Sequence, residues 1–141
     1  MEEKIRDRLA EYEYKNILRK LVKINTVNPP GNEMDIIKVI KNIFNSEVED
    51  HNYEHEFFDH GNNRGSLFLT LPGQNRDKGI AFLGHIDTVP VDNPDEWSYP
   101  PFSACIDQED NMYGRGTADM KGGVTAMILV ALYFLKNKII P

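Results

Sequence analysis

The decapeptide AFLGHIDTVP, residues 81–90, is the most informative stretch of the sequence. Residues 80–83 form a short apolar run, typical of a central strand whose sheet is covered by helices on both faces. Gly84 ends the run, and His85 and Asp87 follow two residues apart, so in an extended chain both side chains point the same way. Ligands of open α/β sheets gather at the carboxyl ends of strands. The stretch therefore predicts a central strand with a polar site at its end.

The segments around this strand alternate between helical and extended patterns. Amphipathic helices are expected over residues 3–23 and after a cap at Asn32, and an almost entirely apolar core helix over about residues 124–136. The second helix has an apolar face of Ile36, Ile37, Ile40, Ile43 and Phe44. Two further strands are expected over residues 53–58 and 66–71, with a turn at 62–65, and a long loop over about 90–111. This order predicts a layered α/β domain.

The chain ends at Pro141, soon after its last helix. A parallel strand followed by a helix normally leads into another strand, because the crossover returns the chain to the sheet. We therefore expect an unfinished sheet that belongs to a longer domain.

Composition narrows the class of partner. The 141 residues carry a net charge of −6, which argues against nucleic acid or an anionic membrane surface as a partner. Cys105 is the single cysteine, so no intramolecular disulfide forms, in keeping with a reducing compartment. Residues 1–9 are charged and lack the apolar core of a secretory signal. The longest apolar run, residues 126–135, is shorter than the roughly 20 residues that span a bilayer. A cytoplasmic protein is expected.

A second cluster, MYGRGTADMKGG at residues 112–123, places Asp119 where a loop meets a helix. Its four glycines indicate tight backbone geometry. One interpretation is a glycine-rich turn with a capping aspartate; a phosphate loop is disfavoured, because the third glycine of a dinucleotide fingerprint and a GK[ST] motif are both missing. A carboxylate held in such a loop near a His-x-Asp strand end also suits a divalent cation.

The two motifs, with Trp97 and Pro101-Phe102 between them and NPPGNE at residues 28–33 before them, resemble one enzyme family. It is the dinuclear zinc hydrolases that include acetylornithine deacetylase, succinyl-diaminopimelate desuccinylase, aminoacylase and glutamate carboxypeptidase. The resemblance covers nearly the whole chain. It implies a three-layer zinc-exopeptidase-like catalytic domain with a mixed central sheet.

The resemblance also implies roles for three residues. His85 is a ligand of one zinc ion, Asp119 bridges two, and Asp87 contributes to catalysis by orienting and polarising His85. The peptide bond between Asp119 and Met120 is expected to be cis. The cofactor is two Zn²⁺ ions, although Co²⁺ and Mn²⁺ accept similar ligands. A water that bridges the metals attacks an amide beside a free carboxylate, in a small N-acyl amino acid or peptide.

The chain also departs from this family. The glutamate base, a further acidic ligand, a final histidine ligand and an inserted lid have no match in these 141 residues. We therefore expect residues 1–141 to be the N-terminal portion of the catalytic domain, inactive alone, without the lid through which the full-length enzyme forms a homodimer. Two alternatives stay open: a truncated non-catalytic folding or binding module, and a metal-dependent phosphoesterase that uses His85 and Asp87.

Other polar residues each have two interpretations. His51, His55 and His60 form either a metal site, if residues 51–55 are helical, or a solvated acidic edge of a sheet. Arg115 either contacts a substrate carboxylate or supports its loop. Lys121 lies near a helix N-terminus, where a positive charge is unfavourable, so either a structural contact or a role in the site is expected.

Overall fold

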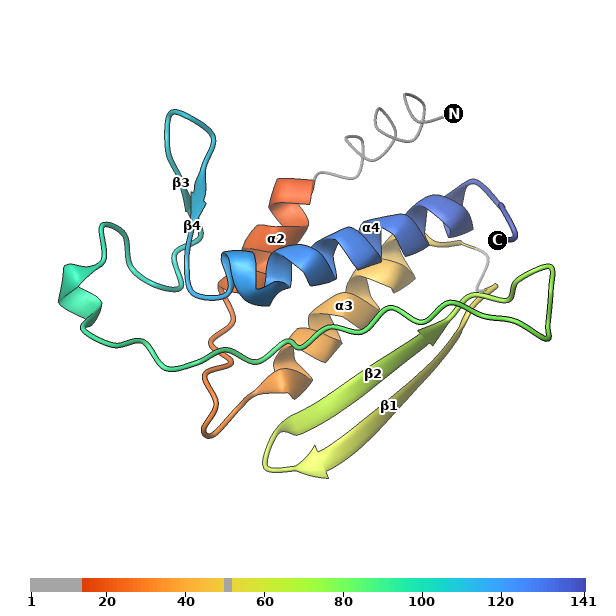
Figure 1. Cartoon of the computed structure of the whole chain (residues 1–141), viewed down its shortest axis with the longest axis horizontal. Helices are drawn as coiled ribbons and strands as arrows, with labels where there is room; N and C mark the ends of the chain where they lie inside the picture. The colour runs from red at the N-terminus through yellow and green to blue at the C-terminus, as the bar shows by residue number, and fades with distance from the viewer. Residues whose placement is uncertain (1–13, 50–51) are drawn as a thin grey trace.

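The computed structural model describes residues 14–49 and 52–141, and combines helices with short antiparallel sheets (Figure 1). In chain order the elements are α2 (Tyr14–Val22), α3 (Glu33–Glu47), β1 (Glu54–Gly61), β2 (Arg64–Thr70), the 3-10 turn η1 (Pro94–Glu96), β3 (Cys105–Ile106), β4 (Met112–Tyr113), the π-helical turn η2 (Thr117–Lys121) and α4 (Gly122–Lys136). The mixture of elements agrees with the α/β class expected from the sequence.

Apolar residues at helical spacing build the core, as the sequence pattern predicts. The expected face of α3 is buried in full. All of it except Ile37 belongs to one core cluster with Ile17 and Leu21 of α2 and Val124, Ile128 and Leu132 of α4. From Tyr14 the first expected helix is present as α2, and the earlier part of that prediction lies outside the described residues. Asn32 occupies the N-cap position of α3, but its side chain makes no capping hydrogen bond and donates instead to the Asn25 carbonyl.

β1 and β2 form an antiparallel hairpin on one side of α3. Asn62 and Asn63 both have positive φ. A two-residue hairpin turn needs this conformation at both positions if its twist is to match that of the strands. Leu67 and Leu69 of β2 pack against the core, whereas Phe68 points away from it. β1 begins one residue later than expected and ends three residues later, whereas β2 begins two residues earlier and ends one residue earlier. The turn at residues 62–63 lies within the expected range, and Arg64 and Gly65 belong to β2.

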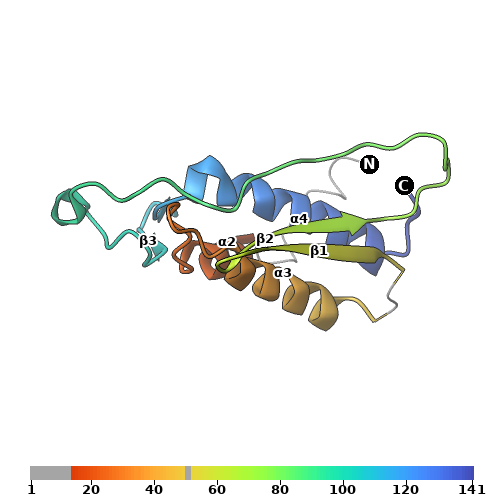
Figure 2. The ribbon, with the colours of Figure 1, turned by 90° about the horizontal axis from the view of Figure 1, so that it is seen from below.

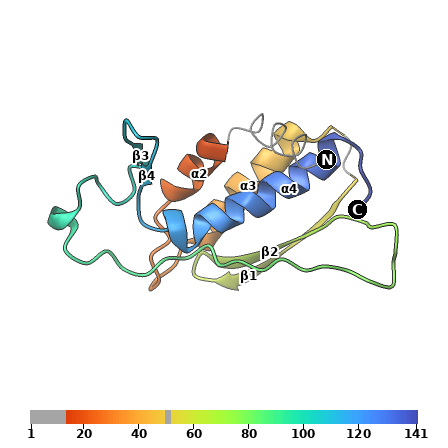
Figure 3. The same cartoon turned by 45° about the horizontal axis from the view of Figure 1, so that its top comes forward.

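The described residues make two layers. The helices lie on one side, and the β1–β2 hairpin lies on the other together with an extended segment, residues 78–92 (Figure 3). After β2 the chain turns at residues 74–77 and then runs along α4 as this segment (Figure 2). A groove of about 1950 Å³ opens between β2, this segment and α4, and its lining includes Leu69, Phe82 and Met127. The second helical layer of the expected three-layer domain is not formed by the residues described here.

The prediction of a buried strand over residues 80–83 is wrong for this chain. The segment is extended but joins no ladder, and Ile80, Phe82 and Leu83 are 85%, 70% and 82% exposed. A strand needs neighbouring backbone to accept and donate its hydrogen bonds. The groove separates this segment from β2, so the described part of the chain supplies no such neighbour along residues 80–83.

α4 confirms the expected apolar helix, but only one side of it is core. Val124, Thr125, Ile128, Leu129 and Leu132 are buried against the other helices, while Met127, Val130 and Phe134 line the groove. Thr117–Lys136 is long and apolar enough to cross a membrane by length and composition, which for one such helix is weak evidence of a span. In the structure α4 packs against α2 and α3.

We predict that polar substitution in the extended segment leaves the stability of the isolated chain almost unchanged. Phe82→Ser should alter the free energy of unfolding by less than about 0.5 kcal/mol, because the side chain is largely exposed. Ile36→Ala, in the buried core, should lower it by about 2–5 kcal/mol. Urea unfolding of both variants measures this. An equal loss in the two would mean that residues 80–83 are packed in solution.

Candidate metal centre

A short parallel pairing fixes the part of the extended segment that carries the candidate residues. Val27 and Thr88 form a parallel bridge, in which the Thr88 N–H donates to the Thr26 carbonyl at 2.9 Å and the Asn28 N–H donates to the Thr88 carbonyl at 2.8 Å. The buried Thr26 hydroxyl also donates to the Ile86 carbonyl at 2.7 Å. Residues 86–88 are therefore fixed against the loop that follows α2.

Gly84 lets this segment approach α4 closely. A Cβ atom at this position would lie 3.0 Å from Val124 Cγ2 and 3.2 Å from Met120 Cε. The absence of a side chain thus brings His85 beside the N-terminal end of the last helix.

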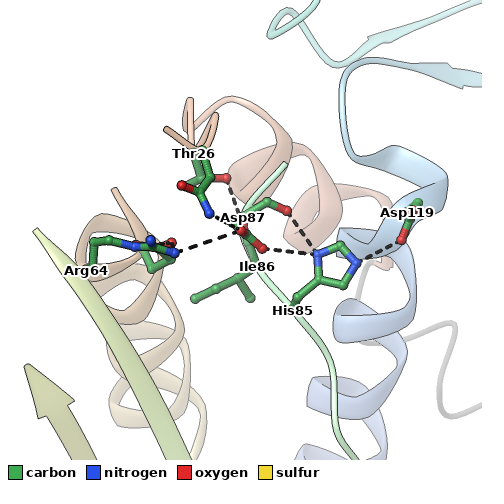
Figure 4. A network of polar contacts seen from close by, with 8 residues as sticks. Thr26, Arg64, His85, Ile86, Asp87 and Asp119 are labelled. Atoms are coloured by element: carbon green, nitrogen blue, oxygen red, sulfur yellow. Dashed lines mark hydrogen bonds and ion pairs between the residues drawn. The ribbon is translucent and has the colours of Figure 1, made fainter. Parts of the chain in front are cut away.

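His85 and Asp119 meet across this contact (Figure 4). His85 Nε2 lies 2.9 Å from Asp119 Oδ1, although the residues are 34 positions apart in the chain. Asp119 sits in η2, where the backbone departs from helical geometry, and its peptide bond to Met120 is cis, which confirms that expectation. The Asp119 side chain is 87% exposed, so its carboxylate is open to further ligands.

Asp87 lies on the other side of the imidazole ring. His85 Nδ1 is 3.1 Å from the Asp87 carbonyl oxygen and 3.3 Å from Asp87 Oδ1. Partial burial tends to lower the pKa of His85, but the hydrogen bonds to the Asp87 carbonyl and to Asp119, together with both negative charges, outweigh it and raise the pKa above its usual value. The structure brings all three candidate residues together, and their catalytic and ligand roles stay predictions.

Three further residues belong to the same network and were missed by the sequence analysis. The Asn28 side-chain amide donates to Asp87 Oδ2 at 2.9 Å. Arg64 donates to the buried Glu33 carboxylate from both Nε and Nη2, and Nη2 lies 2.9 Å from Oε1. Asn28 and Glu33 lie in the NPPGNE stretch, which offered a signal. Arg64 follows a hairpin turn, and nothing local in the sequence indicates that it reaches the site.

Lys121 has the structural role rather than a role at the site. Its ammonium group is buried and donates to the carbonyls of Leu21 at 3.0 Å and Ile24 at 2.8 Å. Leu21 lies in the last turn of α2, and Ile24 lies just beyond the end of that helix. Burial lowers the pKa of Lys121 to about 8.

Arg115 supports its loop. Its guanidinium group lies over the Trp97 ring, 5.0 Å from the centroid, and its backbone N–H donates to Pro101. This contact ties the long loop to the turn before Asp119.

The histidine-rich stretch is a strand from Glu54 onward, so the helical spacing that a metal site would need is not present there. His55 and His60 are exposed, and His60 Nε2 lies 3.0 Å from the Ser66 hydroxyl oxygen. His51 lies outside the described residues.

The donor atoms of His85 and Asp119 fit a zinc ion in kind, because zinc takes imidazole nitrogen and carboxylate oxygen. They do not complete a site, since a catalytic zinc has three protein ligands. Within residues 14–49 and 52–141, no group of three or more His, Cys, Asp or Glu side chains is placed to hold a metal ion. The two residues therefore fit as part of a ligand set.

Comparison with known proteins gives one consistent family. Residues 81–141 match the model of the peptidase family M20/M25/M40. The chain is 32% identical over 129 residues to a probable succinyl-diaminopimelate desuccinylase of Staphylococcus aureus (strain MRSA252), covering 92% of this chain and 29% of that protein. It is 38% identical over 95 residues to the succinyl-diaminopimelate desuccinylase of Roseobacter denitrificans, covering 67% of this chain and 24% of that protein.

A solved structure agrees with the fold. The M20 family metallo-carboxypeptidase Sso-CP2 from Sulfolobus solfataricus matches with a TM-score of 0.58 and 20% identity, over 89% of this chain and 28% of that one. The α/β fold and the resemblance predicted from the motifs are thereby confirmed. The chain spans less than a third of the length of each of these three relatives.

We predict that Lys121 makes the free energy of unfolding rise as the pH increases above about 8. Its pKa is lowered from 10.5 to about 8 in the folded chain, so between these values the unfolded chain binds more protons and the free energy of unfolding rises with pH. In urea unfolding from pH 7 to 10, the free energy of unfolding of the wild type should rise relative to that of Lys121→Met above pH 8. Lys23→Met controls for the loss of one lysine charge. A difference that does not change with pH would contradict the burial of a titrating ammonium group.

Proposed function

We propose that this chain, a relative of the peptidase family M20/M25/M40, supplies part of a metal centre that hydrolyses amide bonds. The observation that carries the proposal is the meeting of His85 Nε2 and Asp119 Oδ1 at 2.9 Å, from two motifs separated by a long loop. The named relatives include desuccinylases and a metallo-carboxypeptidase, and these names favour an amide bond over a phosphate ester.

The metal is proposed to be a pair of Zn²⁺ ions, with His85 as a ligand of one and Asp119 shared by both. When bound, the ions supply a deprotonated water and stabilise the negative charge that develops on the carbonyl oxygen. The residues of this chain hold that centre in place. Asp87 faces Nδ1 of His85, which leaves Nε2, directed at Asp119, as the nitrogen that would bind a metal ion.

The remaining features of the enzyme are proposals of the same kind. Small N-acyl amino acids or peptides are the substrate class, in keeping with the names of the relatives. Residues 1–141 form the N-terminal portion of a cytoplasmic enzyme whose full-length form is a homodimer. The chain alone is inactive, because His85 and Asp119 are too few ligands for a catalytic metal.

A non-catalytic binding or folding module is the alternative for the isolated chain. It is favoured by one observation: in the described residues, the candidate ligands gather in no group of three. Zinc affinity distinguishes the metal centre from the non-catalytic module, because the module is not expected to bind zinc through His85 and Asp119.

We expect the purified chain to bind Zn²⁺ through His85 and Asp119. In calorimetric titrations, His85→Ala and Asp119→Ala should each weaken binding more than about 100-fold, beyond the usual effect of losing an outer partner of a ligand. His55→Ala removes an exposed histidine on β1 and should leave the affinity unchanged. Binding that survives both site variants would refute the assignment of these ligands.

We expect no zinc-dependent hydrolysis of N-succinyl or N-acetyl amino acids, or of dipeptides, by the 141-residue chain. A polypeptide as long as the relatives, with this chain at its N-terminus, should hydrolyse one of these classes and lose that activity on chelation. Metal-dependent turnover by the short chain itself would contradict the proposed inactivity.

A further inference from the structure

We propose that Asn28 is a positioning residue, which with Arg64 holds the Asp87 carboxylate so that its other oxygen faces His85. The functional meaning of this inference rests on the proposed metal centre, whereas the contacts themselves do not. No sequence motif assigns a role to either residue.

The two oxygens of Asp87 have different partners (Figure 4). Oδ2 accepts a hydrogen bond from the Asn28 side-chain amide at 2.9 Å and lies 4.0 Å from Arg64 Nη2. Oδ1 lies 3.3 Å from His85 Nδ1. A carboxylate held by one oxygen cannot rotate freely about its last bond, so the position of Oδ1 beside the ring follows from the contacts of Oδ2.

The backbone places Asn28 for this contact. The parallel bridge between Val27 and Thr88, with the hydrogen bond from Asn28 N–H to the Thr88 carbonyl, sets the register of the two segments. In that register the Asn28 side chain reaches Asp87, the residue before Thr88. The contact is thus fixed by backbone pairing and does not depend on a flexible side chain alone.

Arg64 is itself held in place by Glu33. The Glu33 side chain is 6% exposed, and Arg64 contacts it through both Nε and Nη2. A Cβ atom on Gly31 would lie 2.8 Å from Glu33 Oε2 and 3.0 Å from Arg64 Nε, so the loop covers this ion pair closely. One guanidinium group therefore joins the buried Glu33 carboxylate to the Asp87 carboxylate.

The first test measures zinc affinity in a double-mutant cycle on the full 141-residue chain. Asn28→Ala should weaken Zn²⁺ binding about tenfold, the scale of losing an outer partner of a metal ligand. In an Asp87→Ala background the same substitution should change the affinity less than about twofold, because Asn28 acts through Asp87. An equal effect in both backgrounds, or none in wild type, would overturn the proposal.

Two further variants keep the test interpretable. Asn32→Ala is the matched control: it removes an asparagine from the same loop whose side chain contacts Asn25 and Asn63 and not Asp87, and it should leave zinc affinity unchanged. Should Asn28→Ala fail to give a cooperative urea transition, Asn28→Asp keeps the side-chain shape but replaces the donor by a carboxylate. It should weaken binding more than tenfold.

The second measurement separates this inference from the proposed function. In the metal-free chain, ¹⁵N NMR of the neutral His85 ring reports which nitrogen carries the proton. Asn28→Ala should lower the ratio of Nδ1-protonated to Nε2-protonated ring about threefold to tenfold, as expected for weakening one hydrogen-bonded contact. Failure of wild type to bind zinc would defeat the metal centre alone, whereas an unchanged ratio would defeat the role of Asn28.

Discussion

The parallel pairing of Val27 with Thr88 is the contact on which the site depends. Three hydrogen bonds, two between backbone groups and one from the Thr26 hydroxyl, fix residues 86–88 beside the loop after α2. Along residues 80–83 the same extended segment has no ladder partner among the described residues and is exposed. The pairing therefore gives His85 and Asp87 a defined position, next to the close approach of Gly84 to α4.

Electrostatics then joins elements that are distant in sequence. Arg64 begins β2, Glu33 begins α3, and Asp87 lies in the extended segment, yet one guanidinium group lies near both carboxylates. A buried carboxylate without a partner is strongly unfavourable, so Glu33 requires Arg64 at this position. The placement of the hairpin is thereby coupled to the geometry around His85. Lys121 similarly ties the turn that carries Asp119 to the end of α2.

Local patterns predicted the elements well where the partners lie nearby in sequence. The α3 face, the hairpin turn and the apolar α4 follow from helical periodicity and from asparagines that tolerate positive φ. The same reasoning failed for residues 80–83, where it predicted a buried strand and the structure has an exposed extended segment. An apolar run reports that burial is favourable, but whether another strand lies alongside is a property of the assembled sheet. Asn28 and Arg64 were missed for the same reason, since their contacts with Asp87 span 59 and 23 positions.

From the residues alone came the α/β fold class and the resemblance to one enzyme family, because the two motifs and their order are local features of the chain. The resemblance in turn implied the candidate residues His85, Asp87 and Asp119 and the cis bond after Asp119, and that bond is present. Which groups hold those residues follows from the tertiary structure. Asn28 contacts Asp87 because the backbone pairing places it there, and Arg64 lies near Asp87 because it pairs with Glu33. Lys121 donates to the end of α2 instead of the site. Each of these contacts depends on distances between segments, which no local sequence pattern contains.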